Sequence, residues 1–445
     1  MTTLYASSAT ATAQYYTRYL TKVDGEEPGR WTGHQAGLLG LSGEVTTEQL
    51  KTLLEGRDPT TGTQLGYPLV DRVEKSGKVR KAVAGFDATF SAPKSLSVWW
   101  ALTGDERLAE CHDVAVRSVV DQLERYGSTT HIRSNGRRLH PDTNGLTAAV
   151  FRQTTSRLDD PQLHTHVVIS AKVCTDDGRW YALDARTLKG YQRALGGLYQ
   201  SVLRAEVTAR FGVAWTDIDK GQADIVGVPA ELLEVFSKRA AQVDAAYERK
   251  LAEFWTREGR DPTPKERGAL GREAAADTCG RKTGAAAEDL RTVWRSEAAT
   301  VGVTADTLAA GIAAAAQTPS VVAQQVTVGG IVSELAERRS AWHRLDVTQA
   351  LCDTVRPRPG IDGRLGPPSW NVPSIGCSMT ASTSTRPVRC GGGVAMGGRC
   401  GSNRPPATTP AKRSWPRRNT SSRGRSTNRR PRPTRRRRST RPDWI

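Results

Sequence analysis

The feature that most limits how this chain can fold is an abrupt change in composition after Gly363. Residues 366–445 contain 17 Arg, one Lys and 11 of the 23 Pro, with a single acidic residue and almost no aliphatic periodicity. Such a segment cannot bury enough apolar surface to offset the conformational entropy that ordering would remove. We therefore expect a disordered Arg- and Pro-rich tail over residues 365–445.

Two interpretations of this tail remain open. One is a basic arm that neutralises DNA phosphates and binds less tightly as salt rises. The other, which we favour, is a frameshift in a GC-rich gene. With C-ending codons for Ser369 and Asn371 and a G at the third base of Val372, residues 369–373 would read one base earlier as the helix-forming sequence Leu-Glu-Arg-Ala. The nucleotide sequence around codon 364 would decide between them.

The tail also accounts for the basic character of the chain. The formal charge is +18 in total and +17 within residues 366–445, so the remaining residues are nearly neutral and any DNA-binding surface on them must be local. Seven Cys without a CxxC pair favour free thiols in the cytoplasm over disulfides or a cysteine zinc site. No run of about 18 apolar residues occurs, so we expect no membrane insertion.

Apolar periodicity predicts an α+β fold for residues 1–300. The predicted helices span 105–126, 188–211 and 229–254, and the predicted strands span 69–73, 78–90, 146–151 and 163–173. Strands interspersed with long helices favour a sheet covered by helices, whose strand order the sequence does not fix. Residues 301–364 are expected to form an Ala- and Thr-rich linker and a short helical block over 331–355.

The strongest functional signal is the pair His164 and His166 in one predicted strand. Side chains alternate faces along a strand, so both imidazoles project from one side while Leu163 and Thr165 pack behind. Such a pair suits Mn²⁺, Zn²⁺ or Ni²⁺, and it can hold Mg²⁺ when phosphate and water complete the shell. The alternative is two histidines that share a polar sheet face without a metal.

Three other groups could take part in chemistry. Asp87, on a predicted strand, is a candidate acceptor for a histidine N–H or for a proton, with a turn cap or structural ion pair as the alternative. Lys94, in the turn that follows, is either a DNA contact or a solvated charge. Tyr15 and Tyr16 are either apolar helix residues or nucleophiles, and a phenol of pKa about 10 then needs a base or metal.

Residues 69–85 predict a basic hairpin with its turn at Ser76-Gly77. Its basic side chains, which could grip phosphates or enter a DNA groove, are Arg72, Lys75, Lys78, Arg80 and Lys81. A solvated hairpin is the alternative. A weaker second basic patch consists of Arg133, Arg137 and Arg138.

Several motifs in a fixed order resemble one known family. They are Tyr15-Tyr16, Gly29-Arg30-Trp31-Thr32-Gly33, Leu39-Gly40-Leu41-Ser42-Gly43-Glu44-Val45, Phe90-Ser91-Ala92-Pro93-Lys94-Ser95, Thr155-Ser156-Arg157 and the run from Asp160 to His166. Together they are similar to the relaxase domain of MobF-type conjugative proteins, the TrwC/TraI-like family of the HUH endonucleases, over about residues 1–300.

The resemblance implies a palm-like antiparallel sheet, helices behind it and helical fingers that close over DNA. It also implies a bacterial conjugative relaxase that nicks single-stranded or hairpin origin-of-transfer DNA, leaves a 5′-phosphotyrosyl link and a free 3′-OH, and works with the coupling and secretion machinery. Tyr15 or Tyr16 would attack, and His164 with His166 would hold a divalent metal, Mg²⁺ or Mn²⁺ ahead of Zn²⁺ or Ni²⁺. Asp87 would orient a ligand or accept the tyrosine proton. Arg157 would clamp a phosphate oxygen, unless it forms a salt bridge with Asp159 or Asp160.

The chain departs from the family pattern in its metal ligands and its tyrosines. Gln153 stands where the family has a third histidine, and an amide oxygen is a weaker ligand than imidazole. His140 could substitute only if the fold brings it close. Many relatives carry a second tyrosine pair, whereas only Tyr19 stands nearby, so single-tyrosine chemistry is expected.

The sequence gives no support for a motor. No GxxxxGK[ST] phosphate loop occurs, so helicase or ATPase activity is not expected, although residues 333–342 resemble the start of the helicase portion of such proteins. The chain reads as a truncated relaxase. The alternatives are a catalytically weakened DNA-binding remnant, a rolling-circle replication initiator and, least favoured, a metal phosphodiesterase that uses water.

Overall fold

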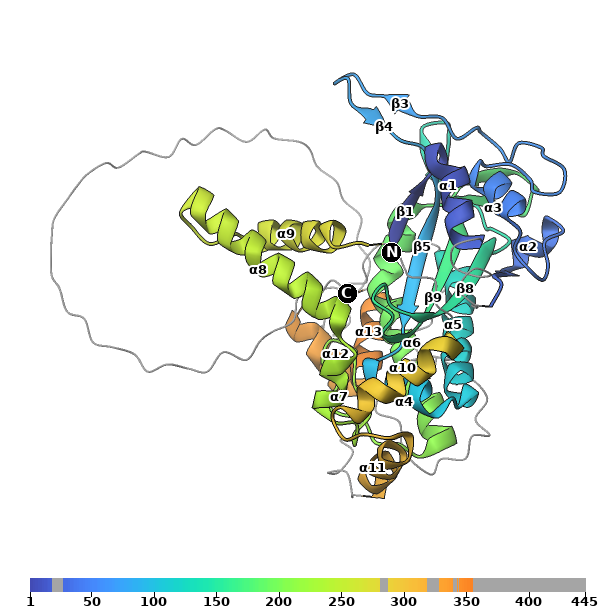
Figure 1. The fold of residues 1–445 in the computed structure, drawn as a ribbon. Helices are drawn as coiled ribbons and strands as arrows, with labels where there is room; N and C mark the ends of the chain where they lie inside the picture. Colours follow the sequence, from blue (N-terminus) through green and yellow to red (C-terminus); the bar gives the residue numbers. More distant parts are fainter. Residues whose placement is uncertain (18–26, 281–286, 318–327, 339–341, 343, 355–445) are drawn as a thin grey trace, which may run out of the picture. The chain divides into compact units, whose positions relative to one another are not determined.

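The centre of the molecule is a five-stranded sheet (Figure 1). The computed structural model describes residues 1–17, 27–280, 287–317, 328–338, 342 and 344–354, so Tyr19 and the tail over 365–445 lie outside the described residues. The strand order is β1-β5-β9-β8-β2, and each neighbouring pair is antiparallel. Their bounds are β1 Thr2–Tyr5, β2 Arg30–Thr32, β5 Val83–Ser91, β8 Ala148–Thr155 and β9 Pro161–Ser170. The predicted α+β class is confirmed.

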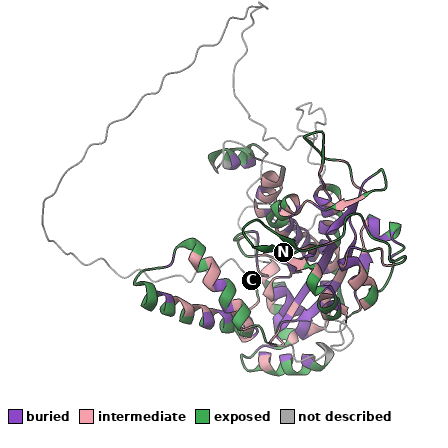
Figure 2. Cartoon of the chain, turned by 90° about the horizontal axis from the view of Figure 1, so that it is seen from above, coloured by how far each residue is buried: buried purple, intermediate pink, exposed green. Residues whose placement is uncertain are grey.

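Helices cover both faces of this sheet (Figure 1). One face packs on α4 (Lys94–Thr103), α5 (Glu106–Gly127) and α6 (Ala185–Phe211), and the other on α1 (Ala9–Gln14) and α3 (Thr47–Leu54). Along β9, Val167 and Ile169 belong to the first core and Val168 to the second, as the two-residue period of a strand requires. Figure 2 shows the sheet buried between these layers.

Local signals explain where the long helices begin. Asp105 and Asp184 each accept a backbone N–H two residues ahead, from Arg107 at 3.1 Å and from Arg186 at 3.0 Å, and so cap α5 and α6. The helix α6 ends at Gly212, which has a φ of 66°. Both helices match the predicted ranges closely because these caps flank their apolar periodicity.

Four predicted elements are each divided into two in the structure, and the strand predicted over 69–73 is reduced to Arg72–Val73. The strand predicted over 163–173 is divided at Ala171 into β9, in the central sheet, and a short strand over Lys172–Cys174, in a separate two-stranded sheet. The helix predicted over 229–254 is divided into α7 (Ala230–Val235) and α8 (Lys238–Glu258), because Phe236 and Ser237 leave the helical backbone region, with φ angles of −95° and −112°. The Phe236 side chain is buried at this break. The strand predicted over 78–90 is divided before β5, where Ala82 N donates to the Asp71 carboxylate at 2.7 Å. The block predicted over 331–355 forms two helices, α12 (Val328–Arg338) and α13 (Arg344–Thr354).

Part of the predicted linker is also helical. Helix α11 (Ala305–Gln317) buries Leu308 and Ile312 in the core that contains α4. Alanine-rich composition suggested a linker, but these two aliphatic residues lie four apart and so share one helix face. The remaining elements are η1 Ala6–Ser8, α2 His34–Leu38, β3 Arg72–Val73, β4 Val79–Arg80, β6 Ile132–Ser134, β7 Arg137–Leu139, β10 Lys172–Cys174, β11 Trp180–Ala182, α9 Pro264–Asp277 and α10 Ala287–Ala299.

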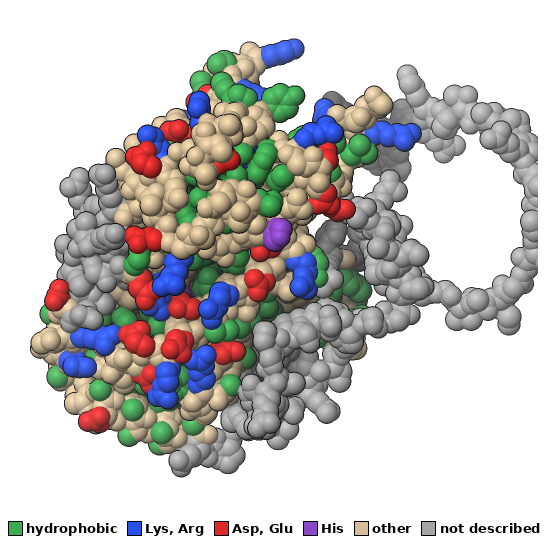
Figure 3. Space-filling view, turned by 90° about the vertical axis from the view of Figure 1, so that its right-hand side faces the viewer, with side chains coloured by type: hydrophobic (Ala, Val, Ile, Leu, Met, Phe, Trp, Pro, Cys, Tyr) green, Lys and Arg blue, Asp and Glu red, His purple; other side chains and the backbone are tan. Residues whose placement is uncertain are grey.

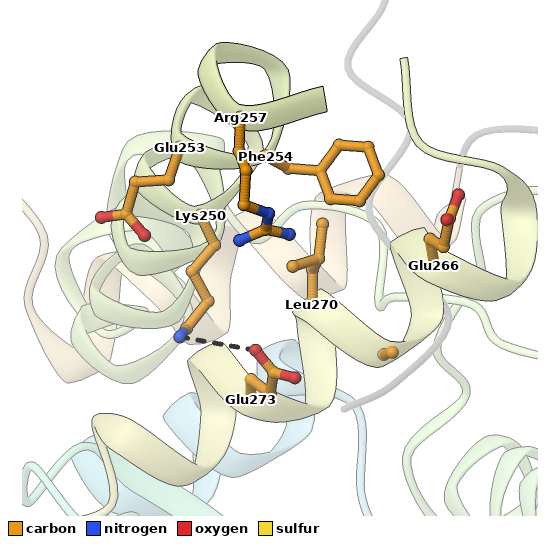
Figure 4. Close-up of a pocket in the computed structure, with 8 residues that line it drawn as sticks. Lys250, Glu253, Phe254, Arg257, Glu266, Leu270 and Glu273 are labelled. Carbon is orange, nitrogen blue, oxygen red and sulfur yellow. Dashed lines mark ion pairs between the residues drawn. The ribbon is translucent and has the colours of Figure 1, made fainter. Parts of the chain in front are cut away.

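Helices α8 and α9 lie apart from the central sheet (Figure 1). Helices α8 and α9 form an arm that projects from the body, and a hollow between them is lined by side chains of these helices alone (Figures 1 and 4). Its charges are largely satisfied within the arm, since Lys250 pairs with Glu273 and Asp277, so the hollow shows no ligand-binding chemistry. Within the described ranges, no helix has both the length and the apolarity needed to cross a bilayer.

Candidate active site

The two tyrosines lie where α1 ends, over the sheet face that carries His164 and His166. Residues 15–17 form a π-helical turn, a geometry often found at functional sites. The Tyr16 side chain is buried, stacks on Phe151 with ring centroids 5.2 Å apart, and donates its hydroxyl to Asp87 Oδ2 at 2.7 Å. Tyr15 is only half-buried and meets Tyr16 edge-on at 5.2 Å. The turn thus presents one enclosed phenol and one accessible phenol.

Asp87 joins the tyrosine turn to the histidine strand. Its carboxylate oxygens lie 2.9 and 3.0 Å from His166 Nδ1, while Oδ2 also accepts the Tyr16 hydroxyl. A carboxylate can only accept, so this contact puts the proton of His166 on Nδ1 and makes Nε2 the basic nitrogen. The register explains the meeting, because Asp87 on β5 pairs with Val168 on the adjacent β9.

His164 is oriented in the same way by the backbone. Its Nδ1 lies 2.9 Å from the carbonyl oxygen of Gln162, which again makes Nε2 the basic nitrogen, and its ring centroid lies 5.4 Å from that of His166. Gln153 on β8 pairs directly with His164 and is buried. Within the part of the chain that the structure describes, no group of three or more His, Cys, Asp and Glu side chains is placed to hold a metal. Among the described residues, the Gln153 amide, directly opposite His164, is a further side chain that could contribute a ligand atom here.

Arg157 reaches the accessible tyrosine. Its Nη2 donates to the Tyr15 hydroxyl at 3.4 Å and its Nη1 to the carbonyl of Gly280 at 3.0 Å, and the side chain is half-buried. Asp160, one of the acids considered as its partner, instead contacts Lys238 at 3.6 Å. The guanidinium therefore lies where it can neutralise charge on the Tyr15 oxygen or on a phosphate bound beside it.

Burial opposes ionisation of both phenols. It raises the pKa of Tyr15, and the Arg157 guanidinium partly offsets that rise. Burial also raises the pKa of Tyr16, and the negative charge of Asp87 and the hydrogen bond to it raise that pKa further. Neither tyrosine is poised as a phenolate by the protein alone, so deprotonation must accompany attack or need an added cation.

Lys94 contacts the protein backbone at the start of β9. Its Nζ donates to the carbonyl of Pro161 at 3.0 Å, and its charge opposes the rise that burial causes in the pKa of Asp160. His140 lies at the base of the β6–β7 hairpin, where its Nδ1 contacts the Thr130 carbonyl at 3.2 Å and its ring lies 6.2 Å from that of His131. Its contacts therefore lie with the hairpin rather than with the paired imidazoles.

The predicted basic hairpin is confirmed as β3 and β4, and it projects from the body (Figure 1). Glu74 N donates to Lys78 O and Gly77 N to Glu74 O, both at 2.9 Å, around the predicted Ser76-Gly77 turn. Its five basic residues are all exposed: Arg72, Lys75, Lys78, Arg80 and Lys81. Elsewhere, on the face shown in Figure 3, basic and acidic side chains are interspersed.

Sequence reasoning missed a buried relay behind the histidine strand. Thr165 points to the face opposite His164 and His166, where its hydroxyl lies 2.7 Å from His112 Nε2; His112 Nδ1 lies 2.6 Å from the Tyr199 hydroxyl. All three side chains are buried. In the sequence, His112 is one position within the predicted amphipathic helix over 105–126. No local pattern distinguishes it from the other polar residues of that helix.

His112 makes a testable contribution to stability against pH. Burial lowers its pKa from 6.5 to about 3, so the unfolded chain binds a proton that the folded chain does not as pH falls through this window. The contribution of His112 to the free energy of unfolding is therefore complete above about pH 6.5. Below that pH it falls by up to about 1.4 kcal/mol per pH unit. Urea unfolding of wild type and His112→Gln between these limits should give a flatter pH dependence for the variant, and equal slopes would contradict the assignment.

Comparison with known proteins gives consistent similarities. The family model described as TrwC relaxase matches residues 2–301. The multifunctional conjugation protein TraI of Escherichia coli is 37% identical over 253 residues, and the TraI of strain K12 is 35% identical over 253 residues. Each match covers 54% of this chain but only 13% of the relative's length.

Solved structures show the same similarity. A metal-bound structure of the conjugative relaxase TrwC in complex with oriT DNA has a TM-score of 0.56 and 29% identity, over 68% of this chain and 98% of that one. TrwC complexed with a 27-mer DNA comprising the recognition hairpin and the cleavage site has a TM-score of 0.55, with the same identity and coverage. A metal-free complex of TrwC with oriT DNA also matches, with a TM-score of 0.56.

Proposed function

The chain belongs to the TrwC relaxase family, and on that premise we propose that it nicks and joins origin-of-transfer DNA through a tyrosine. In the proposed step a phenol oxygen bonds to a backbone phosphorus, the bond from phosphorus to the 3′ oxygen breaks, and that oxygen takes up a proton. One phosphodiester replaces another, so the product retains a bond that a later 3′-OH can attack. The observation that carries the proposal is that Tyr15, Tyr16, Asp87, Arg157 and His166 meet over one sheet face.

We infer that Tyr15 is the attacking residue. Its phenol is half-buried beside a guanidinium, so a DNA phosphate can reach it and Arg157 can offset charge on the attacked phosphate. Tyr16 is enclosed and already donates to Asp87 at 2.7 Å, which suits a residue that positions the carboxylate. Asp87 is then the nearby group that can accept a proton as the phenol attacks.

The imidazole pair fits a divalent cation. Both rings have their Nδ1 protons held by oxygen acceptors, so both Nε2 lone pairs remain basic, as ligation requires. Bound there, the ion would supply Lewis-acid polarisation of the scissile phosphate. We propose Mg²⁺ or Mn²⁺, because two imidazoles and the Gln153 amide oxygen form a mixed donor set that phosphate oxygens and water can complete.

The position of Gln153 opposite His164 leads to a test of this donor set. Gln153→His is expected to tighten Mn²⁺ or Zn²⁺ binding by about tenfold or more, because it replaces a weak amide ligand with imidazole. Isothermal titration calorimetry of the DNA-free protein measures the change. Gln153→Leu serves as the matched control and should weaken binding, and equal affinity in all three proteins would contradict ligation at this position.

We propose that the β3–β4 hairpin holds the DNA outside the reaction centre. Arg72 and Arg80 pair across its two strands, and its exposed basic residues can contact phosphates or enter a groove. Lys94 remains a candidate DNA contact, although its ammonium already donates to the backbone. Coupling and secretion partners belong to the same proposal as expectations from the family. We expect no motor activity because the sequence has no GxxxxGK[ST] phosphate loop.

A denaturation-resistant adduct is the direct test of this function. The full chain is incubated with Mg²⁺ or Mn²⁺ and labelled single-stranded oligonucleotides that tile the origin of transfer, then separated under denaturing conditions. A labelled protein band together with a released 3′-OH fragment supports the proposal. Bound DNA without any covalent product supports the weakened DNA-binding remnant instead, and cleavage that survives loss of both tyrosines supports hydrolysis by water.

A further inference from the structure

The chain carries a second hairpin with a rigid, arginine-rich tip. Strands β6 and β7 are joined by Asn135 and Gly136, whose φ angles of 50° and 74° are those of a type I′ turn. Asn-Gly is the sequence that this turn favours, so the tip is locally well specified. It projects three arginines and, from His131 to His140, includes no acidic residue.

The arrangement of these arginines costs stability unless an anion is bound. Arg133 and Arg138 pair directly across the two strands, and like charges in that position repel. Arg138 donates to His131 Nε2 at 3.0 Å, and Asp184 lies 3.3 Å from His131 Nδ1, so this one guanidinium is held in place. Among the described residues, no acidic side chain lies within ion-pair distance of Arg133 or Arg137, and both are exposed.

Both arginine hairpins are attached to the same short ribbon, β10 with β11. On the first hairpin's side, Lys172 donates to the Tyr67 carbonyl and Gly66 packs against the Trp180 backbone with no room for a side chain. On the side of the β6–β7 hairpin, the Thr130 hydroxyl donates to the Ala182 carbonyl at 2.7 Å. In the opposite direction, Asp184 N donates to the Thr129 carbonyl at the same distance. One platform therefore carries two exposed ribbons, each with an arginine pair across its strands.

We propose that the β6–β7 hairpin is a second DNA contact that binds backbone phosphates through Arg133 and Arg137. The inference rests on the proposed function and adds to it a site that holds DNA away from the cut. Guanidinium groups suit phosphate oxygens, and contacts to phosphate carry no base preference, so this ribbon sets affinity and orientation rather than sequence.

The sheet gives the distance of the β10–β11 platform from the reaction. The β10–β11 ribbon follows the Ser170 end of β9, and six residues separate Ser170 from His164, which is roughly 20 Å at 3.3 Å per residue. That distance corresponds to roughly six base pairs of duplex. On this basis we expect the contacted phosphates to lie on a flanking duplex, away from the scissile bond.

The test compares two DNA probes. The long probe is a fluorescent DNA hairpin with a stem of about ten base pairs, one duplex turn, and a single-stranded 3′ extension; the short probe is the extension alone. For Arg133→Ala with Arg137→Ala we expect at least about tenfold weaker binding of the long probe and little change for the short one. The slope of log affinity against log salt should fall in magnitude by about two, one for each lost phosphate contact.

Three further variants and the behaviour of the wild type decide whether Arg133 and Arg137 bind phosphates. Arg179→Ala is the matched control, since Arg179 is an exposed arginine in the β10–β11 turn that pairs with Asp177 at 2.9 Å, and its affinity should stay within about twofold. Arg133→Lys with Arg137→Lys should recover most of the salt slope, and Arg72→Ala with Arg80→Ala should weaken the long probe independently. Unchanged affinity and slope in the double alanine variant would overturn the second contact alone, whereas a wild-type chain that binds neither probe would overturn the proposed function with it.

Discussion

Tyr15→Phe is expected to abolish covalent capture of DNA, with a loss of at least about a thousandfold in the rate of adduct formation. The substitution removes only the hydroxyl that lies 3.4 Å from Arg157, so the ring still packs against Tyr16. DNA binding should therefore persist. The measurement is the initial rate of adduct formation under denaturing electrophoresis, alongside affinity from fluorescence anisotropy.

Tyr16→Phe is the matched variant, because it removes the neighbouring hydroxyl from the same turn. It breaks the 2.7 Å hydrogen bond to Asp87 but leaves the accessible phenol, so adduct formation should slow by only about ten- to a hundredfold. The Tyr15→Phe, Tyr16→Phe double variant should form no adduct. The reverse ranking of the two single variants would assign attack to Tyr16. An adduct in the double variant would exclude both of these tyrosines as the attacking residue.

Loss of the imidazole pair should have the second-largest effect. His164→Ala with His166→Ala removes both basic Nε2 atoms and is expected to reduce Mn²⁺ binding and adduct formation by about a hundredfold or more. Excess chelator should produce the same loss in wild type. Calorimetric titration with Mn²⁺ separates lost metal binding from lost chemistry.

His140→Ala is the control for this experiment. His140 contacts Thr130 at the base of the second hairpin, so both metal affinity and adduct formation should remain near those of wild type. If His140→Ala weakened Mn²⁺ binding as strongly as the double variant, His140 would be the missing third ligand. If chelator left the wild-type rate unchanged, metal assistance itself would be excluded.

Patterns of short range predicted most of the architecture. The ranges of α5 and α6, the alternation along β9 and the Ser-Gly turn of the β3–β4 hairpin all depend on neighbouring residues, and the structure confirms each of them. The break between α7 and α8 escaped because helical periodicity continues through Phe236, whose burial depends on the tertiary fold. The helix α11 was not predicted, because two aliphatic positions in an alanine-rich run form too weak a pattern.

The active site was predictable in its parts and not in its connections. Alternation alone placed His164 and His166 on one face, but the bond between Tyr16 and Asp87 joins residues 71 positions apart. Such a contact depends on which strand lies beside β9 and on where α1 crosses the sheet, and neither follows from periodicity. The same limit hid His112, whose partners come from β9 and α6.

The register of β1 has a practical consequence for anyone who purifies this protein. Thr2 pairs with Asp87, so the first residues form an edge strand directly beside the carboxylate that accepts the Tyr16 hydroxyl. Burial lowers the pKa of the terminal amine, whose charge also interacts with Asp87. An affinity handle fused at that end would therefore crowd the reaction centre, whereas α13 packs against α6, which covers the opposite face of the sheet.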